Sequence, residues 1–395
     1  MSIITSLLDT DFYIFTMAQA ILINYPDAWV KYKFKCRNFN YTLGKMNQLK
    51  FAKNIQEEIN NFCDLSFKKN ELDFLSRIPY FKSSFIRRLS IFKPEPLYIT
   101  CEVINEELSI TIEGPWFETI WFEVPVLAII SELYSQKHFS KMSWIEKLQN
   151  NLSNISKLDS GFAFAEGGTR RRFTKNYQQV VLQYLMDHHP NRLVGTSNVE
   201  FAYEFGLKPM GTMAHQWLQA HQALTNIRNS QIAALDVWAR TYRGDLGIAL
   251  SDVVGFDAFL QDFDKYFSKL FDGCRHDSGE PYLWTNNLIR HYENYGINPK
   301  TKTALFSDGL TFETMPELYK TYSTRINTAF LIGTELVGIP WKDYIAPQIV
   351  IKMVECNHQP VAKISDSSGK GMCEDLNYLN YVKNIFKINR FNAVL

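Results

Sequence analysis

The segment GFAFAEGGTRRR, residues 161–172, joins a short apolar run to two glycines and three consecutive arginines. The next segment has a helical pattern with one apolar face, formed by Phe173, Tyr177, Val180, Val181, Tyr184 and Leu185. A short strand, a polar turn and an amphipathic helix form the unit from which parallel α/β folds are built. This segment therefore predicts a parallel α/β fold for the chain around it.

The same order recurs toward the C-terminus. The further strand-and-turn segments are RLVGTSN (192–198), KPMGTMAH (208–215), LGIALSD (246–252), LFDGCRHDSG (270–279), TALFSDG (303–309) and AFLIGTEL (329–336). Repeated units of this kind imply parallel strands joined by right-handed crossovers. Because about seven strands suit a barrel better than an open sheet, we predict an irregular, incomplete TIM-like α/β barrel over residues 151–345.

Residues 1–150 follow a different pattern. An amphipathic helix is expected around residues 10–25, and the segments 30–37, 97–103 and 108–114 alternate apolar with polar residues. Alternation with period two is typical of half-exposed antiparallel strands, so this part is predicted to be an α+β domain. Residues 348–370 resemble a hairpin. We expect residues 346–395 to return to the N-terminal antiparallel sheet.

Composition excludes several classes of protein. The 395 residues are 46% hydrophobic and 21% charged, with 42 Lys and Arg against 41 Asp and Glu, so no overall field attracts nucleic acid or a membrane surface. The six cysteines contain no CxxC pair and are expected to be reduced. No secretory signal or membrane-spanning run is recognisable. We expect a soluble cytoplasmic protein.

Polar groups end every predicted barrel strand. One such turn means little by itself, because Gly, Ser, Thr and Asp populate turns for backbone reasons. Seven turns with the same bias favour a ligand site at the carboxyl ends of the strands. The chain has no GxxxxGK[ST], GxGxxG, HExxH or GxSxG motif, which argues against a conventional nucleotide kinase, dehydrogenase, zincin or serine hydrolase.

The segment GTMAHQWLQAHQ, residues 211–222, contains His215 and His221. On a continuous helix their directions differ by roughly 120°, so they are not expected to bind one metal ion. His221 is interpreted as a packing or surface histidine. His215 follows a Gly-Thr turn at a helix start, where free N–H groups favour phosphate. It is either a phosphoryl acceptor, a general base or an ordinary first-turn residue.

Arg170, Arg171 and Arg172 lie at a predicted helix start, where the dipole disfavours cations. This placement suggests a bound anion. Adjacent helical residues point in different directions, so one or two of the arginines are expected to reach the site. At least one of them is expected to be solvated or ion-paired.

Other strand ends carry further candidates. Arg275 suits a carboxylate or phosphate and Asp277 suits a ribose diol, although an Asx turn explains the same sequence. Gly333 and Thr334 suit a phosphomonoester. Two strand-end aspartates could hold magnesium, stabilise a cationic sugar centre or cap helices; they are Asp252 and Asp308. Near the N-terminus, Asp9, Asp11 and Tyr13 are consistent with helix capping and core packing.

Together these motifs resemble the nicotinate phosphoribosyltransferase family, in the bacterial form that salvages NAD precursors. The resemblance runs nearly end to end. Its blocks, in order, are LLDTDFY, KFKCR, GPWFETIWFEVPVLAIISE, GTRRRF, VGTSN, PMGTMAHQW, RHDSG, FSD, IGT, IVIKMVECN and PVAKISDS. The family fold, an α/β domain joined to an irregular barrel, agrees with the pattern analysis.

The resemblance implies an activity. A 5-phosphoribosyl group passes from phosphoribosyl pyrophosphate to nicotinate, giving nicotinate mononucleotide and pyrophosphate for NAD biosynthesis. Transfer is coupled to ATP hydrolysis through a phosphohistidine, which matches His215, with Mg²⁺ and no organic prosthetic group. Tyr13 matches a tyrosine that enters the site from the other subunit, so a homodimer with a shared active site is implied.

Residue roles follow by position in the matching blocks. Thr212 and Arg275 match the nicotinate site, with Arg275 on the carboxylate. The positions matching the ribose, the phosphates and the rest of the substrate site are Arg170, Asn198, Asp277, Gly333 and Thr334. Two residues depart from the family pattern: Gly167 stands where an aromatic residue is more usual, and Gly309 stands where Asn is more usual.

Two alternatives differ in kind. The first is another barrel enzyme acting on a sugar phosphate, including the related transferases for nicotinamide and quinolinate. Arg275 favours nicotinate over nicotinamide. The second is a non-catalytic nucleotide-binding or regulatory protein, which would be expected to lack one of His215, Asp277 or Arg275. All three are present.

Overall fold

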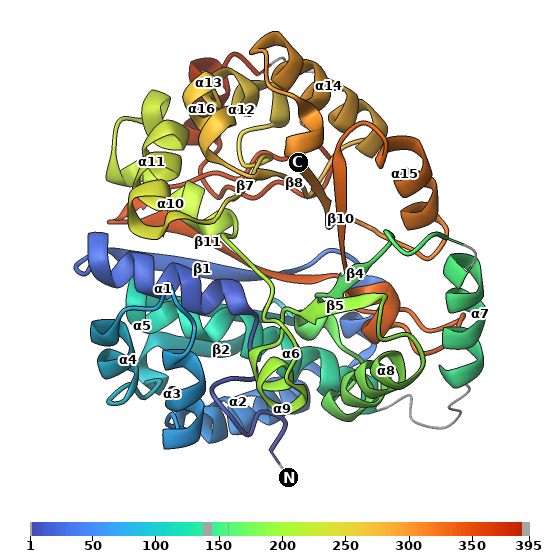
Figure 1. Ribbon diagram of the computed structural model, residues 1–395. Helices are drawn as coiled ribbons and strands as arrows, with labels where there is room; N and C mark the ends of the chain where they lie inside the picture. Colours follow the sequence, from blue (N-terminus) through green and yellow to red (C-terminus); the bar gives the residue numbers. More distant parts are fainter. Residues whose placement is uncertain (1, 137–143, 157, 389–395) are drawn as a thin grey trace.

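The computed structural model describes residues 2–136, 144–156 and 158–388 (Figure 1). Within these residues the strands form two sheets. The first has five strands, all paired antiparallel in the order β12-β11-β1-β3-β2. They are β1 (Trp29–Cys36), β2 (Ile99–Ile104), β3 (Glu107–Pro115), β11 (Ile349–Cys356) and β12 (Gln359–Pro360). The alternating segments of the N-terminal third therefore form the predicted antiparallel strands.

The C-terminal segment joins this sheet. β11 pairs with β1 from Val30↔Cys356 to Cys36↔Ile349, with one irregularity between Lys31 and Tyr32. The hairpin is less regular than the sequence suggested, because β12 has only two residues. Beyond it the chain leaves the sheet, and the Ile364 N–H donates to the carbonyl of Val253 near the parallel strands.

The second sheet has six strands in the order β5-β4-β10-β9-β8-β7, all parallel. They are β4 (Phe164–Glu166), β5 (Leu193–Thr196), β7 (Ile248–Leu250), β8 (Gly273–His276), β9 (Thr303–Phe306) and β10 (Asn327–Ile332). A short strand outside both sheets is β6 (Arg243–Leu246). Among the described residues no pairing joins β5 to β7, so the barrel is incomplete, as predicted.

The predicted strand in KPMGTMAH is absent from the described secondary structure, and the segment instead crosses the gap between β5 and β7. Met210 N–H donates to the carbonyl of Thr196 at 2.9 Å, and Thr212 Oγ1 donates to the carbonyl of Ile248 at 2.9 Å. Pro209 has no N–H to extend a ladder. Gly211 has φ +155°, and a Cβ there would lie 3.0 Å from Tyr13 N. The segment is therefore extended, with contacts to both strands.

Helices cover both sheets (Figure 1). In the N-terminal half they are α1 (Phe12–Asn24), α2 (Gln48–Cys63), α3 (Lys69–Ser76), α4 (Ser83–Leu89), α5 (Trp116–Thr119), α6 (Glu123–Ser135) and α7 (Trp144–Ser156). The remaining helices are α8 (Lys175–His188), α9 (Val199–Phe205), α10 (His215–Leu224), α11 (Ser230–Tyr242), α12 (Phe256–Asp262), α13 (Lys265–Leu270), α14 (Pro281–Asn294), α15 (Thr314–Tyr322) and α16 (Leu376–Ile385). Five of the parallel strands, β4, β5, β7, β8 and β9, are thus each followed by an α-helix.

Helix α1 differs from the amphipathic helix that was expected. Every residue from Phe12 to Ile21 is buried, because the helix contacts α5 on one side and α11 on another. Its polar members bond to backbone carbonyls: Thr16 Oγ1 donates to Thr212 at 2.6 Å and Gln19 Nε2 donates to Tyr80 at 2.9 Å. Buried polar groups paired in this way make α1 a core helix.

Two general findings accompany the fold. All six cysteines are free thiols, as their spacing predicted. No helix in the described part of the chain combines the length and the apolar character that crossing a bilayer requires.

Candidate functional site

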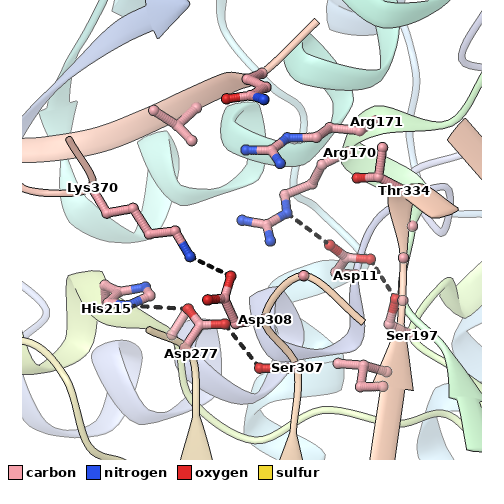
Figure 2. A pocket seen from close by; sticks show the side chains of 18 of the residues that line it. Asp11, Arg170, Arg171, Ser197, His215, Asp277, Ser307, Asp308, Thr334 and Lys370 are labelled. Atoms are coloured by element: carbon pink, nitrogen blue, oxygen red, sulfur yellow. Dashed lines mark hydrogen bonds and ion pairs between the residues drawn. The ribbon is translucent and has the colours of Figure 1, made fainter. Parts of the chain in front are cut away.

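A cavity of about 720 Å³ lies where the two sheets meet. Its walls come from β11, including Lys352, and from the carboxyl ends of the parallel strands, including Asp277, Ser307 and Gly333. Figure 2 shows side chains from both sides directed into the same space. The ligand face of the parallel strands is therefore covered by the antiparallel sheet, and the cavity belongs to both.

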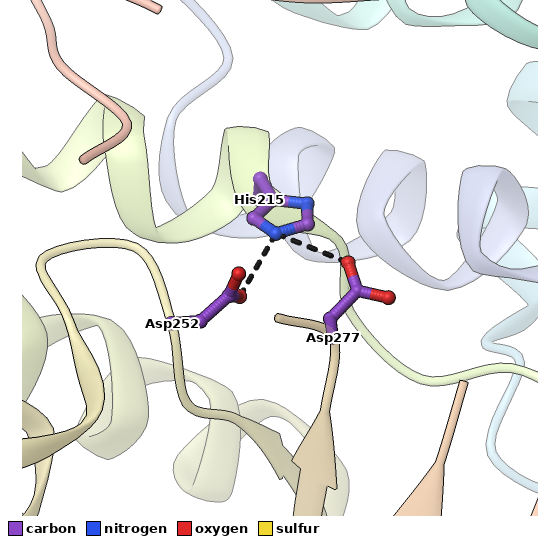
Figure 3. Close-up of side chains that lie close together, drawn as sticks. All are labelled: His215, Asp252 and Asp277. Atoms are coloured by element: carbon purple, nitrogen blue, oxygen red, sulfur yellow. Dashed lines mark hydrogen bonds and ion pairs between the residues drawn. The ribbon is translucent and has the colours of Figure 1, made fainter. Parts of the chain in front are cut away.

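His215 occupies the centre of a hydrogen-bonded cluster (Figure 3). It is the first residue of α10, and its Nε2 lies 2.9 Å from Asp252 Oδ1 and 3.2 Å from Asp277 Oδ2. The carboxylates extend from the ends of β7 and β8, since each follows its strand by one or two residues. His215 and Asp252 are almost fully buried, and Asp277 is partly open to the cavity.

The electrostatics define the protonation of this cluster. Burial, followed by repulsion from Lys363, lowers the pKa of His215 to about 3, so the imidazole is neutral near pH 7. Burial alone would raise the pKa of Asp252, but Lys363 and His215 outweigh it and hold that pKa well below its usual range. Because Nε2 faces two ionised carboxylates, it must carry the proton. Nδ1 then carries the lone pair.

Asp252 and Asp277 have further partners. Ser278 Oγ donates to Asp252 Oδ2 at 2.6 Å, and Lys363 Nζ lies 3.1 Å from the same oxygen. Ser307 Oγ donates to Asp277 Oδ1 at 2.8 Å. Burial would raise the pKa of Asp277, but attraction to Arg275 and His215 lowers it to about 2.

His221 lies outside this cluster. Its Nε2 is 2.9 Å from Tyr25 Oη and its Nδ1 is 2.7 Å from the Trp217 carbonyl. It is fully buried, and burial lowers its pKa to about 4. His221 is therefore a packing histidine. The group of described residues with metal-ligand geometry is His215, Asp252 and Asp277 instead.

Cations surround the cavity. Its lining contains Arg37, Arg170, Arg171, Arg275, Lys352, Lys363 and Lys370. Arg171 Nε donates to the Ile349 carbonyl at 3.1 Å, and burial lowers its pKa to about 10, with further repulsion from Arg170. Such a concentration of positive charge in a partly enclosed space attracts polyanions.

The three arginines at 170–172 have different surroundings. Arg170 and Arg171 belong to a 3₁₀ turn, Thr169–Arg171, and point into the cavity (Figure 2). Arg172 is fully buried and forms a two-pronged hydrogen bond with Asp9 at 2.6 and 2.9 Å. Because α8 begins only at Lys175, the arginines precede the helix and do not occupy its first turn.

Close packing explains the glycines near Arg170. A Cβ on Gly168 would lie 2.2 Å from Val337 Cγ2 and 3.0 Å from the Gly333 carbonyl. A Cβ on Gly167 would lie 2.6 Å from Leu331 Cγ. An aromatic residue therefore has no space at 167 beside Leu331. Gly309 has φ +57° with open space around it, a conformation that Asn also tolerates.

Four of the predicted site assignments have surroundings that the sequence did not show. Asn198 does not line the cavity: it is fully buried, caps α9 through Phe201 N and donates to Asp9 at 2.8 Å. Thr212 lines a smaller neighbouring cavity of about 290 Å³, which it shares with Arg275. Tyr13 lines the main cavity of its own chain and contacts Glu123 at 3.4 Å. Its entry from a second subunit stays a prediction of the family resemblance.

The fourth case is the two aspartates predicted as magnesium ligands, Asp252 and Asp308. Both oxygens of Asp252 are occupied by His215, Ser278 and Lys363. Asp308 is paired with Lys370 (Figure 2). A lysine on each carboxylate opposes a second cation, so Asp252 and Asp308 do not fit a shared Mg²⁺ site.

Several lining residues were missed in the sequence. Glu123 accepts from Gln216 Nε2 at 2.8 Å and lies 3.8 Å from Arg170, at the start of a helix whose following residues are mostly apolar. Lys352 and Lys363 come from the C-terminal strand region. Lys352 could have been recognised from the sequence, because a lysine within the apolar run IVIKMVEC is unusual for a buried strand.

An incomplete parallel barrel with a histidine–carboxylate cluster and a cation-lined cavity at its strand ends defines an α/β enzyme with an anion-binding site. Comparisons then identify the family. A profile described as the nicotinate phosphoribosyltransferase (NAPRTase) family matches residues 162–390, and one described as the NAPRTase N-terminal domain matches residues 8–131. The chain belongs to the nicotinate phosphoribosyltransferase family.

Individual proteins agree with this assignment. The nicotinate phosphoribosyltransferase of Xanthomonas campestris pv. campestris (strain B100) is 47% identical over 391 residues, covering 97% of this chain and 96% of that protein. The one from Ectopseudomonas mendocina (strain ymp) is 45% identical over 401 residues, covering 98% of each. The crystal structure of the Vibrio cholerae enzyme is similar with a TM-score of 0.91 at 37% identity, covering 98% of this chain and 94% of that chain.

Proposed function

We propose that this protein transfers the 5-phosphoribosyl group of phosphoribosyl pyrophosphate to the ring nitrogen of nicotinate, coupled to ATP hydrolysis through His215. The products are nicotinate mononucleotide and pyrophosphate, and the reaction contributes to NAD biosynthesis. The observation that carries the proposal is the His215–Asp252–Asp277 cluster at the floor of a cation-lined cavity. Family membership supports the substrates.

His215 has the properties of a phosphoryl acceptor. Its lowered pKa keeps the imidazole neutral, and the bond from Nε2 to Asp252 leaves the lone pair on Nδ1. In the proposed step this lone pair attacks the γ-phosphorus of ATP, the bond to the β,γ-bridging oxygen breaks, and ADP leaves with that electron pair. Water later cleaves the P–N bond and releases phosphate.

Arg275 has the properties of a carboxylate receptor. Nη1 donates to the Met213 carbonyl at 3.2 Å and Nη2 lies 3.8 Å from Asp277, whereas Nε is buried without a hydrogen-bond partner among the described residues. Arg275 lines both the main cavity and the smaller one, whose other walls include Ala165, Ile248 and Leu305. Apolar walls suit a flat ring, and a guanidinium favours its carboxylate over an amide.

The donor requires a polyanion site and a stabilised cationic sugar. In the proposed transfer the nicotinate nitrogen attacks C1 of the ribose, and the C1–O bond breaks toward pyrophosphate. Asp277 is the carboxylate available for the ribose, while Arg170 and Thr334 line the same cavity for the phosphates. Magnesium is proposed to enter with the diphosphate, since Mg²⁺ commonly binds through substrate phosphates.

The remaining parts of the proposal rest on family resemblance. We propose a homodimer, although Tyr13 lines the cavity of its own chain. The free thiols fit a reducing compartment, and we propose that the reaction takes place in the cytoplasm.

The test is nucleotide formation from labelled nicotinate and phosphoribosyl pyrophosphate, with and without ATP. Nicotinamide and quinolinate serve as parallel acceptors. We expect ATP-stimulated turnover of nicotinate alone. If nicotinamide or quinolinate gives product instead, that compound replaces nicotinate as the proposed acceptor. If none of the three acceptors gives product, a binding protein with the same fold is favoured.

His215→Ala tests the phosphohistidine. ATP hydrolysis should be abolished, and transfer should be weakened without necessarily disappearing. His221→Ala is the matched control, because this histidine lies on the same helix outside the cavity lining. Unchanged ATP hydrolysis in the His215 variant would refute the role.

A further inference from the structure

One carboxylate of the main cavity is neutralised from outside the cavity. The acidic side chains that line the cavity are Asp11, Glu123, Asp277, Asp308 and Glu335. The first four each lie within 3.8 Å of a cation that itself lines the cavity, and these cations are Arg170, Arg275 and Lys370. Glu335 differs, because the cation 2.9 Å from its carboxylate is Lys147 of α7, which is not among the described lining residues.

Helix α7 holds Lys147 at the outer side of this wall. Leu148, Leu152 and Ile155 are buried on one face of the helix, at the spacing that fixes a helix against the core. Lys147 Nζ contacts Glu335 and also donates to the carbonyl of Ile339 at 2.7 Å. The ammonium group is thus bound to both ends of the segment 335–339.

The segment that carries Glu335 is a π-helix, Thr334–Gly338, which begins two residues after the end of β10. Such turns are uncommon and often lie at functional sites. A Cβ on Gly338 would lie 2.5 Å from the carbonyl oxygen of Arg171, so the π-helix packs closely against the arginine turn. Figure 2 shows Thr334 on the same side of the cavity as Arg171. The main chain at Glu335 is therefore held beside the arginines.

An unpaired charge on Glu335 would disfavour phosphate at this wall. Gly333 and Thr334, which are predicted to bind the phosphomonoester of the ribose, come directly before it in the chain. A carboxylate beside a phosphate repels it, and in a partly exposed site this repulsion weakens binding about 5- to 50-fold. Since a partly exposed ion pair contributes little to stability, the larger effect of Lys147 is on the charge of this wall.

We propose that Lys147 is a positioning residue that neutralises Glu335 from outside the cavity, so that this wall accepts the phosphomonoester of a sugar phosphate. This inference rests on the proposed function, because it takes the 5-phosphate of phosphoribosyl pyrophosphate to bind at Gly333–Thr334. Lys147 acts through Glu335 and does not touch the ligand. Its effect is therefore confined to one end of the donor, and the diphosphate end is bound without it.

Calorimetric titration of the full chain with ribose 5-phosphate tests the binding. Lys147→Met keeps an unbranched side chain and loses the charge, so the affinity should fall about 5- to 50-fold. The affinity for inorganic pyrophosphate, which has no sugar phosphomonoester, should change much less. Lys31→Met is the matched control, because Lys31 forms an ion pair of similar exposure with Glu113 at 3.0 Å and is not among the described lining residues.

A second change separates the charge from the anchoring of the segment. Lys147→Met also loses the hydrogen bond to the Ile339 carbonyl, and a looser segment would weaken binding for a different reason. Lys147→Met combined with Glu335→Gln lacks that bond too, but it has no unpaired carboxylate at this wall. The affinity of the double variant should therefore return close to the wild-type value. Lys147→Arg keeps the positive charge and should bind ribose 5-phosphate as the wild type does.

The possible results lead to different conclusions. Unchanged ribose 5-phosphate affinity in Lys147→Met would overturn the inference, and so would a loss that Glu335→Gln does not restore. In transfer assays Lys147→Met should raise the KM for phosphoribosyl pyrophosphate and leave the KM for nicotinate and kcat close to the wild-type values; an equal rise in both KM values would count against it. If the binding results are as expected but the wild-type chain transfers nothing to nicotinate, the proposed function fails while the inference about Lys147 stands.

Discussion

The Asp9–Arg172 pair allows a quantitative test of how the arginine segment is held. Both side chains have 0% exposure, and Asp9 accepts from Arg172 at 2.6 and 2.9 Å and from Asn198 at 2.8 Å. Removing one partner of a buried pair leaves an uncompensated charge, at a cost of about 3–5 kcal/mol. We expect Asp9→Asn to lower the free energy of unfolding by this amount at pH 7, because the amide keeps the shape but loses the charge.

The pH dependence gives an independent magnitude. Burial would raise the pKa of Asp9, but Arg172 and Lys175 lower it from 3.8 to about 2, which corresponds to about 2 kcal/mol. A carboxyl with a lowered folded-state pKa stabilises the protein above its unfolded-state pKa and loses this effect as the pH falls through the folded value. The difference between wild type and Asp9→Asn should therefore be full above pH 4 and shrink toward pH 2.

Urea unfolding at several pH values is the measurement. The control is Glu113→Gln, which removes the partner of Lys31 at a site where the carboxylate side chain is 38% exposed. That change should cost less than about 1 kcal/mol. A loss below about 1 kcal/mol for Asp9→Asn at pH 7 would refute the reasoning, as would a loss that stays constant from pH 7 to pH 2.

Two further predictions concern the reaction. Arg275→Lys keeps the charge but loses the planar guanidinium, so the KM for nicotinate should rise about tenfold or more while the KM for the donor changes less. Steady-state kinetics with each substrate varied in turn measures both values. An equal rise in the two KM values would contradict this role of Arg275. Asp252→Asn removes the nearer of the two ionised partners of His215, so ATP hydrolysis should fall about 10- to 100-fold; undiminished phosphorylation of His215 would contradict this.

The sequence predicted the strand-and-turn units well because each one is local. In LFDGCRHDSG a short apolar run, a polar end and a helix start follow one another within ten residues, and β8 and α14 have these positions. Where the outcome depended on distant chain segments, prediction failed. The segment around Pro209 lies in the gap between two strands. Helix α1 is buried by other helices, and its own sequence pattern gives no information about these contacts.

For the candidate site too, local sequence patterns were informative and contacts between distant segments were not. The structure places the predicted residues His215, Asp277 and Arg275 together, because they end strands or begin a helix and parallel strand ends meet at one edge. Strand β11 brings Lys352, and helix α6 brings Glu123, to the same cavity from positions far away in the sequence. The surroundings of Asn198 could not be predicted from its motif: it ends a strand, but its side chain turns back to cap α9 and donate to Asp9.

The strand pairing between the two ends of the chain has a consequence for synthesis. β1 is translated long before its neighbour β11, because most of the parallel-strand domain lies between them in the sequence. Until then one edge of β1 is unpaired, and its alternating Lys31, Lys33 and Lys35 oppose pairing with other nascent chains. Strand β11, with Lys352, forms one wall of the main cavity. The cavity is therefore completed only after β11 has been translated, and a chain interrupted before β11 lacks that wall of the cavity.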